Sequence, residues 1–278
     1  VQAHALEYHH GALFYANRNE LYRYKSNGVS EKICALPDST LIIRDLHFMD
    51  DGWLLATTKG LYNYSNGTFQ NLLEDESITS LFIDNWRRLW VGTLSNGAKV
   101  FSEGEWISMR ENDTAHPLVN NQVRTIDQDI KGNIWIGTYA GITVVNSSLR
   151  DCYHLSHKEQ VSWSLKHSSV YAIFRDRQGG MWVGTYYGGL SYFNPNYTFY
   201  GISPDDPESL DGFLFGKMAE DTKGNLYIAT EHGRLNCLDR TTQKVKYFDP
   251  GLLRIPCRTT KSVWYDAEND RLYIGTFR

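Results

Sequence analysis

Four aspartates recur at one position of a repeated pattern, and carboxylates can act as general acids or bases in catalysis. They lie nine residues before a threonine in four segments of the chain: Asp84, Asp129, Asp176 and Asp221. Three of them are followed three residues later by Gly132, Gly179 or Gly224, a spacing typical of a tight turn with a positive φ at glycine. A catalytic residue normally breaks the symmetry of a repeat. The recurrence therefore favours a turn-forming role for these aspartates over a catalytic one.

Histidines are the other candidates for site chemistry. His154 and His157 form an H-x-x-H pair that could hold a metal ion, but no third ligand lies nearby in the sequence, which favours a surface pair. His9 and His10 receive the same interpretation. The chain has no G-x-S-x-G, H-E-x-x-H or phosphate-loop motif. We therefore predict no catalytic residue, no metal and no cofactor.

The elements that would position any site are seven repeats. Each repeat has a small residue and a threonine at the end of an apolar run: Ala56-Thr57, Gly92-Thr93, Gly137-Thr138, Gly184-Thr185, Ala229-Thr230 and Gly275-Thr276, with a weaker first copy at Ala16-Asn17. Successive copies are 40, 36, 45, 47, 45 and 46 residues apart. This period is typical of four-stranded propeller blades.

Each repeat reads as four short strands. The second strand is apolar throughout, as in "IWIGT" and "MWVGT", which indicates that both of its faces are covered. Trp90, Trp135 and Trp182 would then fill the space between neighbouring blades. We therefore expect an all-β fold, a seven-bladed propeller of four-stranded antiparallel blades whose last blade is incomplete. The expected blades span residues 1–37, 38–74, 75–110, 111–155, 156–201, 202–249 and 250–278, within one domain covering 1–278.

Composition agrees with one large β unit. The 278 residues are 41% hydrophobic and 14% aromatic, and the net charge of −4 without a basic cluster argues against nucleic-acid binding. No apolar run has the roughly 18 residues that a membrane span requires. The first residue is not methionine, and the sequence stops after the second strand of the seventh repeat, so we expect a piece of a longer protein. Of the cysteines, only Cys237 and Cys257 are placed so that they could pair.

Units three to five carry a family resemblance. The segments "VNNQVRTIDQDIKGNIWIGTYAGI" and "HSSVYAIFRDRQGGMWVGTYYGGLSYFNP", with the linking "SPDDPESL", resemble the regulator-propeller repeats of hybrid two-component sensors found in Bacteroidetes. The resemblance implies a periplasmic ectodomain, anchored in the inner membrane, with a second propeller and a β-sandwich downstream and a histidine kinase beyond them. It further implies detection of oligosaccharides and a homodimer in the full-length sensor.

A ligand would be expected at the end of the ring where the loops joining second to third strands lie. These loops carry residues that vary between repeats, and we predict the ligand-binding residues to be Tyr139, Tyr186, Tyr187, His232, Phe277 and Arg278. Tyrosine rings suit sugar faces, and histidine and arginine suit hydroxyl or acidic groups. The alternative is that these aromatics cap neighbouring turns or contact another domain. Two other functions stay open: an interaction platform without a small ligand, and a lyase similar to those that inactivate streptogramins.

Overall fold

The computed structural model describes residues 3–25, 27–50, 52–158, 164–193, 199–200, 210–212, 214–231, 234–242, 244–248 and 259–277. These residues form six four-stranded antiparallel sheets and one two-stranded sheet. No helix able to cross a membrane occurs in this part of the chain.

Each four-stranded sheet uses four consecutive strands, paired in chain order. The strands of the first three sheets are β1 (Ala5–His9), β2 (Ala12–Asn17), β3 (Glu20–Tyr24), β4 (Ser30–Ala35); β5 (Ile43–Met49), β6 (Gly52–Thr57), β7 (Gly60–Ser65), β8 (Thr68–Glu74); β9 (Ile78–Ile83), β10 (Leu89–Thr93), β11 (Ala98–Ser102), β12 (Glu105–Met109). Those of the remaining sheets are β13 (Val123–Gln128), β14 (Ile134–Thr138), β15 (Gly141–Val145), β16 (Cys152–Leu155); β17 (Val170–Arg175), β18 (Met181–Thr185), β19 (Gly189–Phe193), β20 (Phe199–Tyr200); β21 (Leu214–Glu220), β22 (Leu226–Glu231), β23 (Leu235–Asp239), β24 (Lys244–Phe248); β25 (Thr259–Asp266), β26 (Arg271–Phe277).

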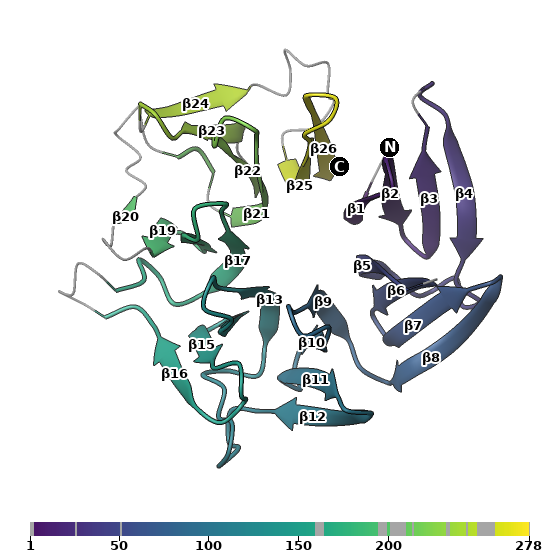
Figure 1. Cartoon of the computed structure of the whole chain (residues 1–278), viewed down its shortest axis with the longest axis horizontal. Helices are drawn as coiled ribbons and strands as arrows, with labels where there is room; N and C mark the ends of the chain where they lie inside the picture. Colours follow the sequence, from purple (N-terminus) through teal and green to yellow (C-terminus); the bar gives the residue numbers. More distant parts are fainter. Residues whose placement is uncertain are drawn as a thin grey trace.

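The sheets are arranged as blades of a propeller, with the first strand of each blade nearest the centre and the fourth at the rim (Figure 1). The all-β propeller of four-stranded antiparallel blades is confirmed. The expected number of seven such blades is wrong for the described residues, because β25 and β26 form only a two-stranded sheet. This sheet lies between the last and the first blade, since β25 packs against β21 and β22 on one side and β1 on the other.

The tryptophans of the second strands hold adjacent blades together. Trp90, Trp135 and Trp182 are 0%, 6% and 1% exposed, respectively. Each belongs to a core cluster that includes residues of the following blade, as Trp135 does with Val170 and Ile173. The predicted burial of these indoles between blades is confirmed. Burial of side chains of this size stabilises the ring by about 2–3 kcal/mol each.

In four repeats the residue before the threonine is glycine, which allows two blades to approach closely. A Cβ on Gly137 would lie 2.7 Å from Val170 Cγ1 of the next blade, and one on Gly184 would lie 2.6 Å from Phe215 Cβ. The adjacent threonine closes the following loop, because Thr138 Oγ1 donates to the Gly141 carbonyl at 2.9 Å. Thr57, Thr93, Thr185 and Thr230 make the equivalent bond.

Candidate functional site

Antiparallel strands divide the loops of a propeller between its two ends. The loops between second and third strands share one end with those that enter the first strands, and the turns between first and second strands lie at the other. We name the first end the tyrosine face, after Tyr139, Tyr186 and Tyr187 in its loops, and the second end the turn face.

The structure describes three of the six predicted ligand-binding side chains. Tyr139 and Tyr187 are exposed, at 56% and 60%, and Tyr186 is half-buried. His232 and Arg278 lie outside the described residues, and for Phe277 only the backbone is described, at the end of β26.

The three tyrosines come together with two residues that the sequence did not single out, Arg124 and Tyr171. The Arg124 guanidinium lies 4.0 Å from the Tyr171 ring centre and 5.2 Å from that of Tyr139. Tyr171 stacks on Tyr186 at 5.8 Å between ring centres, and Tyr186 meets Tyr187 edge to face at 4.1 Å. We call these five residues the tyrosine–arginine cluster. It presents aromatic faces beside one fixed positive charge.

β-bulges explain why Arg124 and Tyr171 belong to this cluster. The pairing of β13 with β14 skips Arg124, and that of β17 with β18 skips Tyr171. A bulged residue is released from the strand alternation, which can direct its side chain to a new surface. The signal was present in the sequence, because buried Val123 and Ile126 are three residues apart, whereas an unbroken strand would place same-face residues two or four apart.

Arg124 also ties its blade to the next one. Its Nη1 donates to Ser169 Oγ at 2.7 Å and to the Val170 carbonyl at 3.4 Å. Burial lowers the pKa of Arg124, and the Tyr171 and Tyr139 hydroxyls partly oppose this effect. The guanidinium nevertheless stays charged, because its ordinary pKa lies above 12.

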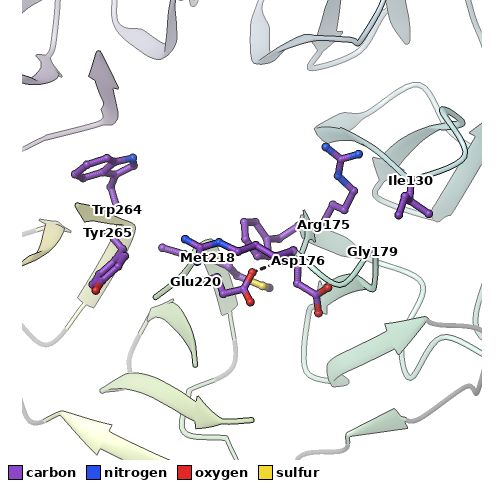
Figure 2. A pocket seen from close by; sticks show the side chains of 11 residues that line it. Ile130, Arg175, Asp176, Gly179, Met218, Glu220, Trp264 and Tyr265 are labelled. Atoms are coloured by element: carbon purple, nitrogen blue, oxygen red, sulfur yellow. Dashed lines mark hydrogen bonds between the residues drawn. The ribbon is translucent and has the colours of Figure 1, made fainter. Parts of the chain in front are cut away.

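The turn face holds a cavity of about 420 Å³ between the inner strands of adjacent blades. Trp264 and Tyr265 border it on one side, and Arg175 and Ile130 on the other (Figure 2). Glu220, 9% exposed, also lines it and accepts the Arg177 backbone N–H at 2.8 Å. The cavity thus combines aromatic and apolar walls with both signs of charge, at the end of the ring opposite the predicted residues.

A half-buried carboxyl lies close to this cavity. Asp127 of β13 accepts the Arg175 backbone N–H at 2.8 Å, which joins two inner strands. Burial raises the pKa of Asp127 to about 6, although hydrogen bonds from the Gln128 and Arg175 amides and nearby cations oppose the shift. This carboxyl therefore takes up a proton in mildly acidic solution.

The repeated aspartates are structural, as their recurrence indicated. Asp84, Asp129 and Asp176 each accept a hydrogen bond from the buried indole six residues later, at 2.9, 3.1 and 2.9 Å. Asp221 accepts two backbone amides of its own turn. These carboxylates bind protein donors in the interior, and Asp176 also lines the turn-face cavity.

The structure also shows the surroundings of the histidine pair and of three cysteines. His154 Nδ1 lies 3.2 Å from Thr143 Oγ1, and His157 Nδ1 lies 2.7 Å from the Leu165 carbonyl. The described ranges contain no group of three or more potential metal ligands. Cys34 and Cys152 are free thiols. Cys237, which the sequence left as a possible partner of Cys257, is also a free thiol, and Cys257 itself lies outside the described residues.

Some of these repeats match known proteins. The model of the family "Two component regulator propeller" matches residues 117–140 and 164–187. A histidine kinase of Formosa agariphila is 28% identical over 118 residues, which cover 37% of this chain and 9% of the kinase.

Solved structures share the fold. The extracellular domain of a putative hybrid two component system from B. thetaiotaomicron superposes with a TM-score of 0.79 at 20% identity, over 99% of this chain and 38% of that one. Virginiamycin B lyase from Staphylococcus aureus does so with a TM-score of 0.72 at 10% identity, over 100% of this chain and 95% of the lyase. The chain thus spans less than two fifths of the histidine kinase and of the hybrid-system domain. The model of the two-component regulator propeller family thus matches two of the repeats, within the segments that carry the family resemblance of the sequence.

Proposed function

We propose that this propeller is part of the periplasmic ectodomain of a hybrid two-component sensor, where it helps to detect oligosaccharides. The family match and the histidine kinase relative support the sensor assignment. The signal would pass to a histidine kinase in another part of the same protein, anchored in the inner membrane. In this proposal the propeller itself is not an enzyme.

The proposed ectodomain is larger than the chain. β25 and β26 would be the inner half of a seventh blade, because they occupy the position between β21 and β1. Strands from elsewhere in the protein would complete that blade. A second propeller and a β-sandwich of the same protein would be its neighbours, and the full-length sensor would be a homodimer.

The tyrosine–arginine cluster is the observation that carries the sugar proposal. Sugar rings have apolar C–H faces and hydroxyl edges, so they bind to exposed aromatic rings with polar groups alongside. Tyr139 and Tyr187 supply such rings, and Arg124 supplies hydrogen-bond donors 5.2 Å from the Tyr139 ring centre. Three of the five cluster residues, Tyr139, Tyr186 and Tyr187, lie in the loops where the sequence predicts the ligand.

Calorimetric titration of the complete ectodomain with neutral and acidic plant and host oligosaccharides tests this function. Tyr139→Ala and Tyr187→Ala should each weaken binding about tenfold or more, since one aromatic contact with a ligand contributes on the order of 1–2 kcal/mol. Tyr153→Ala is the matched control, because Tyr153 is 52% exposed on the outer strand β16. Unchanged affinity in the two cluster variants would reject this site, and no binding to any oligosaccharide would reject the function.

An interaction platform is the second candidate, and the turn face favours it. Ile130 and Trp86 are 70% and 50% exposed there, and each covers a turn glycine of the next blade, Gly179 or Gly132. Exposed apolar side chains beside a cavity are typical of surfaces that bind another protein or domain. Replacing Ile130 by Ser should then weaken domain association without affecting sugar binding, which analytical ultracentrifugation of separately produced domains would measure.

A further inference from the structure

The first strands of six consecutive sheets contain a bulge at the same repeat position. The residues skipped by the strand pairing, from the second blade to the two-stranded sheet, are Arg44, Thr79, Arg124, Tyr171, Gly216, Lys217 and Lys261. Each bulge lies near the beginning of its strand, which is the end of the ring that carries the tyrosine face. Four of the seven residues are cations and none is acidic, although the whole chain has a net charge of −4.

Two of these cations have no carboxylate partner within the part of the chain that the structure describes. Lys261 pairs with Glu231, and Lys217 lies 3.8 Å from Asp45. Arg44 and Arg124 form no ion pair with any described residue; their side chains instead bond the serine that precedes the next inner strand, Ser77 at 3.1 Å and Ser169 at 2.7 Å. A serine hydroxyl is neutral, so it does not compensate the positive charge of the guanidinium as a carboxylate would.

The guanidiniums also retain unused donors. Arginine has five N–H groups in a planar fork, and the hydrogen bonds of Arg44 and Arg124 to described residues are all donated from Nη1. Both side chains are half-buried, and this burial lowers the pKa of each. A partly desolvated guanidinium with free donors is a strong binding site for a carboxylate or sulfate.

A histidine, His4, lies near two cations at the same end of the ring. His4 precedes β1, and burial lowers its pKa, followed by the charges of Lys261 and Arg18. Arg18 lies in the loop between β2 and β3, which also belongs to the tyrosine face. The cationic character therefore extends beyond the bulged residues themselves.

We propose that the ligand of the tyrosine face is an acidic oligosaccharide whose carboxylate or sulfate groups bind Arg44 and Arg124. This inference rests on the proposed sugar-sensing function and specifies the class of sugar. Tyr139 and Tyr171 flank Arg124, so one sugar ring can stack while its acidic group reaches the guanidinium. Arg44 and Arg124 lie on the second and fourth blades, so a ligand must have several sugar units to reach both.

Titration of the complete ectodomain with three sets of oligosaccharides tests the inference: oligogalacturonides, sulfated carrageenan oligosaccharides and neutral malto-oligosaccharides. We expect the wild-type protein to bind one of the two acidic sets, more weakly as ionic strength rises, and the two acidic sets distinguish carboxylate from sulfate. Arg124→Gln and Arg44→Gln should each weaken binding at least about tenfold, as the loss of a charged hydrogen bond does. Arg150→Gln, on an exposed outer loop, should bind like the wild type.

Two further variants separate ligand binding by Arg124 from its hydrogen bond to Ser169 of the next blade. Ser169→Ala removes the partner of Arg124 but keeps its charge, so it should lower the melting temperature while acidic sugars still bind. Arg124→Lys keeps the charge but loses the fork, so its affinity should fall between wild type and Arg124→Gln. Binding of neutral sugars that neither salt nor Arg124→Gln changes would overturn the acidic-ligand inference and leave sugar sensing intact. Failure of all three sets to bind would overturn both proposals.

Discussion

Replacing Asp176 by alanine tests whether the repeated aspartates hold the blades together. The carboxylate is 3% exposed and accepts hydrogen bonds from the Gln178 and Gly180 amides and the Trp182 indole, each at 2.9 Å. Arg240 donates a further bond to it. The variant leaves an indole, two backbone amides and a cation without their acceptor. Breaking a buried ion pair costs about 3–5 kcal/mol, so we expect a loss of about 4 kcal/mol.

Differential scanning calorimetry and urea unfolding would measure this loss. About 4 kcal/mol corresponds to a fall in melting temperature of about 10 °C for a domain of this size. Asp129→Ala is the graded comparison. The donors to the Asp129 carboxylate among the described residues are all neutral: the backbone amides of Lys131 and Asn133, the Asn133 side-chain amide and the Trp135 indole. This variant should lose about 2–3 kcal/mol. Asp38→Ala, in an exposed loop, should lose less than about 1 kcal/mol.

The pH dependence gives a second measure of the same interaction. Burial alone would raise the pKa of Asp176, but hydrogen bonds from Arg240, Trp182 and Gly180 outweigh it and hold the pKa below its ordinary value. The stabilisation is therefore complete above the unfolded pKa of about 4 and is lost as the pH falls through the lower folded pKa. The difference between wild type and Asp176→Ala should shrink below pH ~4. A loss under about 1 kcal/mol at pH 7 would refute the structural interpretation.

Three other perturbations test separate parts of the structure. The free energy of unfolding of the wild type should fall as the pH rises from ~4 to about 6, because the raised pKa of Asp127 makes the native state bind its proton more tightly than the unfolded state does. Asp127→Asn should remove this fall, and urea unfolding at several pH values that still showed it would contradict the prediction. Gly137→Ala should destabilise by about 1–3 kcal/mol, since the new Cβ would lie 2.7 Å from Val170 Cγ1, and an unchanged melting temperature would contradict the close approach of the blades. Tyr187→Gly should change the free energy of unfolding by less than about 1 kcal/mol, because Tyr187 is exposed and has a φ of 56°, while a larger loss on thermal unfolding would show that its ring supports the fold.

Repetition made much of the fold predictable. Trp135, Gly137 and Thr138 perform the same tasks in several blades, so the same residue types recur at fixed spacing and reveal burial, close approach and the loop bond. The seventh repeat has only the inner-strand pattern, and it forms only β25 and β26 among the described residues, which therefore contain six four-stranded blades.

The candidate site was only partly predictable. Tyr139 and Tyr187 stood out because their loop positions vary inside a constant frame. Arg124 lies within a strand, where alternation alone does not show its direction, and its partner Ser169 is 45 residues away. The bulge that releases Arg124 becomes visible only through the three-residue spacing of Val123 and Ile126. The turn-face cavity combines residues of several repeats, so no local pattern could indicate it.

Hydrogen-exchange mass spectrometry of the complete ectodomain, with and without an oligosaccharide that binds it, tests most directly where the ligand lies. We predict slower exchange in peptides covering residues 122–126, 138–140, 170–172 and 185–188, which contain the tyrosine–arginine cluster. Exchange around the turn-face cavity, in residues 174–179, 218–220 and 264–266, should stay unchanged. Protection of the turn-face peptides, with none at the tyrosine face, would contradict the proposed site.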